Sequence, residues 1–149
     1  MKKKNLVIVL LALAMIIAVG KETYAYYISK TEVNVKATSS NIICDAAIAE
    51  VSNAEKSKFG YSEFKVIVKN YDSSNTVTKE PLNYTLTIEN NGSNGLFGYN
   101  NNFNSSLEFN DSMQSGSKED KSYIIAVKGN NGLSENVNYK VKLNCSQKN

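Results

Sequence analysis

Apolar and polar residues alternate along most of the chain after residue 26, with the period of two that is typical of β-strands. The clearest example is residues 82–89, where Leu82 and every second residue after it are apolar. The same pattern predicts further strands over residues 33–37, 64–69, 107–109, 123–127 and 137–144. The chain is therefore expected to consist mainly of β-structure.

Turn-forming residues separate these segments. Asp72-Ser73-Ser74-Asn75 lies between two of them, and Asn91-Gly92 and Asn94-Gly95 follow residues 82–89. Gly129-Asn130-Asn131-Gly132 precedes the last segment. Asn and Gly tolerate the positive φ that hairpin turns require. Strands about 10–20 residues apart with such turns predict an all-β fold, an antiparallel β-sandwich.

The segment 45–58 is compatible with two structures. It is rich in alanine, begins at Asp45 and ends before Gly60, as a helix would. Ile42, Cys44 and Ile48 also alternate as one face of a strand. We favour a strand over residues 42–51 followed by a loop, and periodicity alone does not decide so short a run.

The first 25 residues have a different pattern. Lys2–Lys4 precede an unbroken apolar run of 14 residues, Leu6–Val19, and the small residues Thr23 and Ala25 stand before Tyr26. The run is shorter than the roughly 18 residues of a membrane span. The pattern predicts a hydrophobic signal helix within residues 1–25, cleaved between Ala25 and Tyr26 during export. An uncleaved N-terminal membrane anchor is the alternative.

Removal of residues 1–25 leaves a single domain, residues 26–149. The chain of 149 residues has a net charge of +3, but four of its 17 basic residues and one of its 14 acidic residues lie within residues 1–25. The mature chain therefore carries 13 charges of each sign. Because nucleic-acid binding requires a surplus of basic residues, we expect no nucleic-acid partner.

The two cysteines, Cys44 and Cys145, are predicted to form a disulfide. Cys44 is in phase with Ile42 and Ile48, and Cys145 is in phase with Leu143, so both point to an apolar face. The oxidising environment outside the cytoplasm permits such a disulfide in an exported chain. Closing a loop of about 100 residues stabilises a fold by roughly 4–5 kcal/mol in the chain-entropy model. Two unpaired buried cysteines are the alternative.

The composition excludes most catalytic and metal sites. The chain has no histidine, which removes the commonest general base, the nucleophile–histidine pairs and the usual zinc ligand. It also has no glycine-rich phosphate loop and no calcium loop. Asn100-Asn101-Asn102 is predicted to be a polar loop, and Glu119-Asp120-Lys121 a solvated turn. We therefore expect no catalytic residue, no metal and no cofactor.

The residues Thr23-Tyr24-Ala25-Tyr26-Tyr27 resemble the end of a particular class of Gram-positive signal peptides. A dedicated, SipW-type signal peptidase processes this class, and an aromatic pair straddles the cut. The class includes the TasA/camelysin family of biofilm fibre proteins. The specific likeness covers about the first 30 residues. Residues 64–71 and 82–90 resemble, more loosely, strands of small exported proteins of this kind.

The resemblance implies an extracellular or cell-surface matrix protein with an immunoglobulin-like or jelly-roll sandwich. Its partners would be the signal peptidase during export and then other copies of itself or other matrix proteins. The best-known members polymerise by donating an N-terminal strand to the next subunit. Camelysin is also described as a metalloprotease, and that activity does not carry over because this chain has no histidine.

Residues 26–38 are the candidate assembly strand, with Val33, Val35 and Ala37 on one face. After cleavage they form a new N-terminus that can complete a sheet edge on a neighbour by β-augmentation. Pairing within the same domain is the alternative. The leading prediction is an exported structural or matrix protein that assembles by strand addition.

A surface-associated binding module for a glycan or a protein is the alternative function. Tyr61, Tyr71 or Tyr99 would then stack on sugars, although tyrosines on strands more often pack against neighbouring side chains. A secreted hydrolase is the third hypothesis, and the sequence contains no constellation that favours it.

Overall fold

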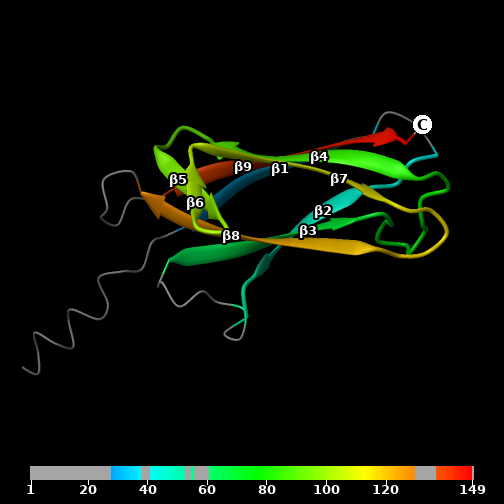
Figure 1. Ribbon diagram of the computed structural model, residues 1–149, viewed down its shortest axis with the longest axis horizontal. Coiled ribbons are helices and arrows are strands. Elements are labelled where there is room, and N and C mark those ends of the chain that lie inside the picture. The colour runs from blue at the N-terminus through cyan, green and yellow to red at the C-terminus, as the bar shows by residue number, and fades with distance from the viewer. Residues whose placement is uncertain (1–27, 38–40, 53–54, 56–60, 130–136, 149) are drawn as a thin grey trace, which may run out of the picture.

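The computed structural model describes residues 28–37, 41–52, 55, 61–129 and 137–148. Within these residues the chain forms nine strands in two sheets that face each other (Figure 1). The strands are β1 (Ile28–Ala37), β2 (Asp45–Glu50), β3 (Ser62–Lys69), β4 (Leu82–Asn90), β5 (Gly95–Tyr99), β6 (Asn102–Asn104), β7 (Ser106–Met113), β8 (Asp120–Gly129) and β9 (Val137–Gln147). The fold is the all-β sandwich that the alternation predicts. The predicted signal helix and the cleavage residues Thr23, Ala25 and Tyr26 lie outside the described residues.

One sheet has four strands in the order β1-β9-β4-β7, and the other has five in the order β2-β3-β8-β5-β6. Neighbouring strands are antiparallel, as predicted, with one exception in the described part of the chain. β1 runs parallel to β9, with a register shift between Lys30 and Glu32. Parallel strands need a long connection. Here the whole domain supplies it, because β1 and β9 are the first and last strands.

The alternation predicts seven of these strands, if the strand favoured in the ambiguous segment is counted. That strand is β2, which covers residues 45–50. The sequence analysis is wrong at β5 and β6, and also at the expected turn 119–121, where Asp120 and Lys121 begin β8. Asn94-Gly95 is typical of a turn, yet Gly95 begins β5, and Asn102 begins β6 inside the expected polar loop. Asn100 and Asn101 form the two-residue turn between these strands, with φ values of 49° and 66°.

The core is the layer of apolar side chains between the two sheets. Alternate residues of each central strand point into this layer, as the period of two requires. Phe64 stacks on Tyr139 with ring centroids 4.3 Å apart, and Phe97 meets the Tyr139 ring edge-on. The side chains with no exposed surface include Val66, Val68, Leu82, Leu86, Ile88, Phe97, Met113, Ile125, Val127, Val141 and Leu143.

Asn70 is a fully buried polar residue that ties two loops together. Its Nδ2 donates hydrogen bonds to the carbonyl oxygens of Gln114 (2.8 Å) and Ser117 (2.9 Å). Its Oδ1 accepts a hydrogen bond from the Glu119 N–H at 2.8 Å. These partners offset the cost of burying the amide. The loop after β3 and the loop between β7 and β8 are therefore held in one arrangement.

A polar seam of four residues also joins the two sheets near one edge. The hydroxyls of Tyr84 (β4) and Tyr123 (β8) share a hydrogen bond of 2.6 Å, and Lys121 (β8) forms a 2.7 Å ion pair with Asp111 (β7). Burial raises the pKa of both tyrosines, and the Lys121 ammonium lowers the pKa of Asp111. The tyrosine pair gives two buried hydroxyls a hydrogen-bond partner, and the Lys121–Asp111 pair is more exposed to solvent.

The tyrosine pair can be tested by a double-mutant cycle. Tyr84→Phe should lower the free energy of unfolding by about 1–3 kcal/mol, because the Tyr123 hydroxyl remains buried without this partner. Tyr84→Phe/Tyr123→Phe should cost less than the sum of the two single changes. Urea unfolding measures all four proteins, and strictly additive losses would contradict a direct hydroxyl–hydroxyl bond.

Candidate assembly edge

β1 is an edge strand of the four-stranded sheet, and β9 is its only hydrogen-bonded neighbour among the described strands. Paired residues of neighbouring strands share a face of the sheet. After the register shift, the three candidate assembly residues therefore lie on the same side as core residues of β9. The pairs are Val33 with Val141, Val35 with Leu143, and Ala37 with Cys145.

The three candidate residues differ in how far they are covered. Val33 is half-buried and packs against the core. Val35 is 40% exposed, the one large apolar side chain that is exposed within the described residues, and Ala37 is also exposed. The opposite sheet therefore covers only part of the inner face of β1. Since stabilisation scales with the apolar area buried, this strand is held less strongly than the central strands.

β9 forms the other half of this edge. The side chains of Val141 and Leu143 have no exposed surface, and that of Cys145 is 1% exposed. Without β1, the backbone N–H and C=O groups along one side of β9 would lose their partners, and part of this apolar row would be uncovered. β9 is therefore the strand onto which an added strand of matching pattern would pair.

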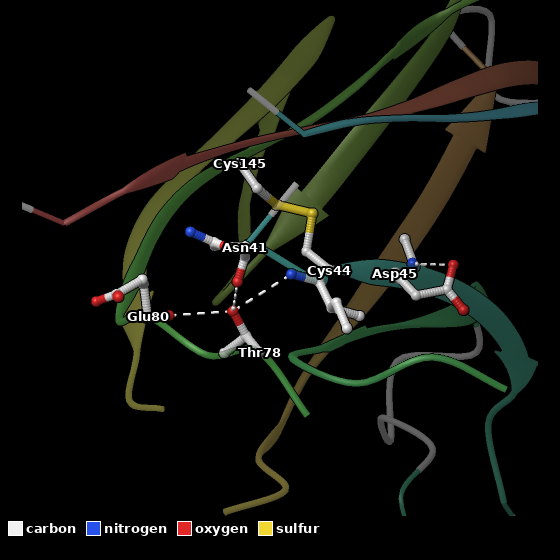
Figure 2. Close-up of a disulfide and its surroundings, with 8 residues drawn as sticks. Asn41, Cys44, Asp45, Thr78, Glu80 and Cys145 are labelled. Atoms are coloured by element: carbon white, nitrogen blue, oxygen red, sulfur yellow. Dashed lines mark hydrogen bonds between the residues drawn. A yellow bond between two sulfur atoms is a disulfide. The ribbon is translucent and has the colours of Figure 1, made fainter. Parts of the chain in front are cut away.

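The predicted disulfide between Cys44 and Cys145 is present, with Cα atoms 6.7 Å apart (Figure 2). Cys145 belongs to β9 and Cys44 directly precedes β2, so the bond joins the two sheets. It closes a loop between residues 101 positions apart. β1 precedes Cys44 and lies outside this closed loop.

Residues 41–44, which precede β2, are held by Thr78, whose side chain is 1% exposed. The Thr78 hydroxyl accepts a hydrogen bond from the Ile43 N–H (3.2 Å) and donates to the carbonyl oxygen of Glu80 (3.0 Å) or Asn41 (3.3 Å) (Figure 2). The Lys79 N–H also donates to the Asn41 carbonyl oxygen at 3.1 Å. Residues 41–44 are thus anchored to the domain independently of β1.

The three tyrosines proposed for sugar stacking lie in different places. Tyr99 contacts Phe109 and the core, with ring centroids 4.8 Å apart. Tyr71 has two lysine ammonium groups 5.3 and 5.6 Å from its ring centroid. Tyr61 lies beside Phe103, with ring centroids 5.1 Å apart. The structure therefore does not bring the three rings together.

The described residues contain no cluster of three or more His, Cys, Asp or Glu side chains able to hold a metal. They also contain no helix long and apolar enough to span a membrane. Comparisons of the chain with protein-family models and with curated proteins find no match.

Two elements of this edge have no local signal in the sequence. Thr78 lies outside any alternating segment, so its role as an anchor depends on partners more than 30 residues away. The pairing of β1 with β9 also depends on the whole fold, and only the shared apolar phase of residues 33–37 and 141–145 indicates it.

Loss of the disulfide should strongly destabilise the domain. Cys44→Ala/Cys145→Ala should lower the free energy of unfolding by about 4–5 kcal/mol, because the unfolded chain regains the entropy of an open loop. Urea unfolding of the oxidised protein, the reduced protein and the double variant provides the measurement. Equal unfolding midpoints for oxidised and reduced protein would contradict the prediction.

Proposed function

We propose that this protein is an exported structural protein of the extracellular matrix and that it assembles by β-strand addition. In the assembly, β1 of one subunit pairs with β9 of the next subunit and completes its four-stranded sheet. This function would need no catalytic residue, metal or cofactor.

The observation that carries the proposal is the position of β1 outside the disulfide-closed loop. The strand is hydrogen-bonded to β9 alone within the described residues, and its connection begins at the anchored segment 41–44. β1 can therefore leave its own sheet without breaking the pairing of any other strand. Exchange of an identical strand between subunits is a low-cost route to assembly, because the same contacts form again in the neighbour.

The length of the connection limits the geometry of such an assembly. Ala37 ends β1, and Asn41 is the next described residue, held by the 78–80 loop. Four residue steps of extended chain span at most about 14 Å. Exchanging subunits must therefore lie in contact, and that contact would cover apolar surface at the exposed Val35.

The strand order also supports a jelly-roll arrangement over an immunoglobulin-like one. Consecutive strands pass from one sheet to the other except at β2–β3 and β5–β6. Eight strands wound between two sheets in this manner are typical of jelly rolls. We propose that β2 is an additional edge strand of that arrangement.

Export is supported by two independent features. The pattern of residues 1–25 is that of a cleaved signal. The Cys44–Cys145 disulfide is a bond that persists in oxidising, extracytoplasmic environments. We propose that a signal peptidase is the partner during export, and that other copies of the chain or other matrix proteins are the partners afterwards.

The secreted protein should begin at Tyr26, which intact-mass spectrometry of the medium or cell-surface fraction will determine. Ala25→Leu should prevent cleavage, because signal peptidases require small residues at this position. Thr23→Ser, which keeps a small residue, should be processed normally. Wild-type protein found only at precursor mass in the membrane fraction would instead support the anchor.

Strand exchange can be tested by cross-linking along one row of the outer face of the four-stranded sheet. In this row Asn34 pairs with Lys142, Lys142 with Thr87, and Thr87 with Glu108. Mature Asn34→Cys protein mixed with mature Lys142→Cys protein should form an intermolecular disulfide during assembly. Glu108→Cys, in the same row but on the far edge strand, is the matched control and should form none with Asn34→Cys.

Two further samples complete this experiment. The double variant Asn34→Cys/Lys142→Cys verifies the β1–β9 register under denaturing gel analysis. A chain without residues 26–38 should remain monomeric at concentrations at which the mature protein forms oligomers or filaments. If the mature protein stays monomeric and the mixed variants form no cross-link, β1 pairs only within its own subunit and the proposal is wrong.

A further inference from the structure

The outer face of the five-stranded sheet contains a hollow of about 290 Å³. Its floor follows a row of paired residues across four strands: Glu63 on β3, Ala126 on β8, Gly98 on β5 and Phe103 on β6. Ala126 has only a methyl side chain and Gly98 has none, so the surface is depressed in the middle of the row. The larger side chains of Glu63 and Phe103 rise at its two ends.

Two aromatic rings form one wall of this hollow. Tyr61 and Phe103 meet edge-to-face, with ring centroids 5.1 Å apart and an interplanar angle of 63°. The Phe103 ring lies close over Gly98, where an added Cβ would come within 2.6 Å of it, and the Lys128 ammonium lies 4.2 Å from its centroid. The Phe103 ring is therefore held in place by its neighbours, and Tyr61 extends the apolar wall.

Four polar residues and Ile124 line the rest of the hollow. Asn100 and Asn101 line the hollow from the two-residue turn between β5 and β6, where both have positive φ values. Neither amide side chain has a partner within the described residues. The carboxylates of Glu55 and Glu63 complete the lining, and Glu55 is held by an ion pair of 2.6 Å to Lys65.

This combination of groups matches the chemistry of a sugar. The C–H face of a pyranose ring packs on an aromatic ring, while amide and carboxylate oxygens accept hydrogen bonds from its hydroxyls. Among the described residues, Lys65 and Lys128 lie beside the hollow and offset the charges of Glu55 and Glu63. A neutral ligand is therefore favoured over a polyanion or a polycation.

We propose that this hollow binds a sugar unit of a neutral polysaccharide, with Tyr61 as the stacking residue and Asn100 and Asn101 as hydrogen-bonding residues. The site lies on the five-stranded sheet, whereas β1 belongs to the four-stranded sheet. Polysaccharide binding and strand exchange are therefore separate properties, and either can fail without the other.

The test is affinity electrophoresis of the mature protein in native gels that contain dextran, laminarin or levan, with alginate as the anionic comparison. The mature protein should be retarded by at least one neutral polysaccharide. Tyr61→Ala should weaken that binding by about tenfold, because the stacking surface is lost. Tyr61→Phe, which keeps the ring, should retain it.

Two other variants make the test specific. Asn100→Gly/Asn101→Gly removes both amides and keeps residues that tolerate positive φ, so it should weaken binding in a folded protein. Tyr71→Ala removes a half-buried tyrosine elsewhere and should bind as wild type does. Thermal unfolding checks that each variant is folded. The proposal is overturned if no neutral gel retards the protein, if only alginate does, or if Tyr61→Ala binds equally well.

Discussion

The apolar layer between the two sheets is the constraint on which the other features depend, because neither sheet can cover its own inner face. Residues such as Val66 and Leu143 have no exposed surface only while the sheets stay together. The polar groups that enter this layer are therefore paired, as in the Tyr84–Tyr123 hydrogen bond. The Cys44–Cys145 bond adds a covalent link between the sheets. The sheets are less fully covered at an edge, as the exposed Val35 of β1 shows.

The central strands could be predicted from the sequence because their two faces meet different environments. In β4 and β9, one face is buried in the core and the other meets solvent, so the alternation is unbroken. β5 could not be predicted in this way. An added Cβ at Gly95 would collide with the side chain of Val137, and one at Gly98 would collide with Phe103. These glycines look like turn residues until their distant neighbours are known.

Only part of the candidate assembly edge could be predicted from the sequence. The apolar phase of residues 33–37 places Val33 and Val35 on one face, and the phase of Cys44 and Cys145 favours a shared layer. The alternation does not specify which strand β1 joins or in which direction it runs. The anchor at Thr78 likewise depends on hydrogen bonds to residues on another segment. The local pattern thus predicts which face of a strand is buried, whereas the strand with which it pairs is determined by the topology of the whole fold.

The pairing of the first strand with the last has a consequence for the order of synthesis. Ile28 is synthesised long before Val137, its partner in the sheet. Until β9 emerges, β1 has no intramolecular partner in its sheet, and contacts between such distant segments form slowly. In the proposed export, newly secreted chains at high local concentration would therefore encounter one another while their first strands are unpaired. Under the proposed assembly, the choice between closing a monomer and joining a neighbour would depend on the rate of secretion as well as on the stability of the fold.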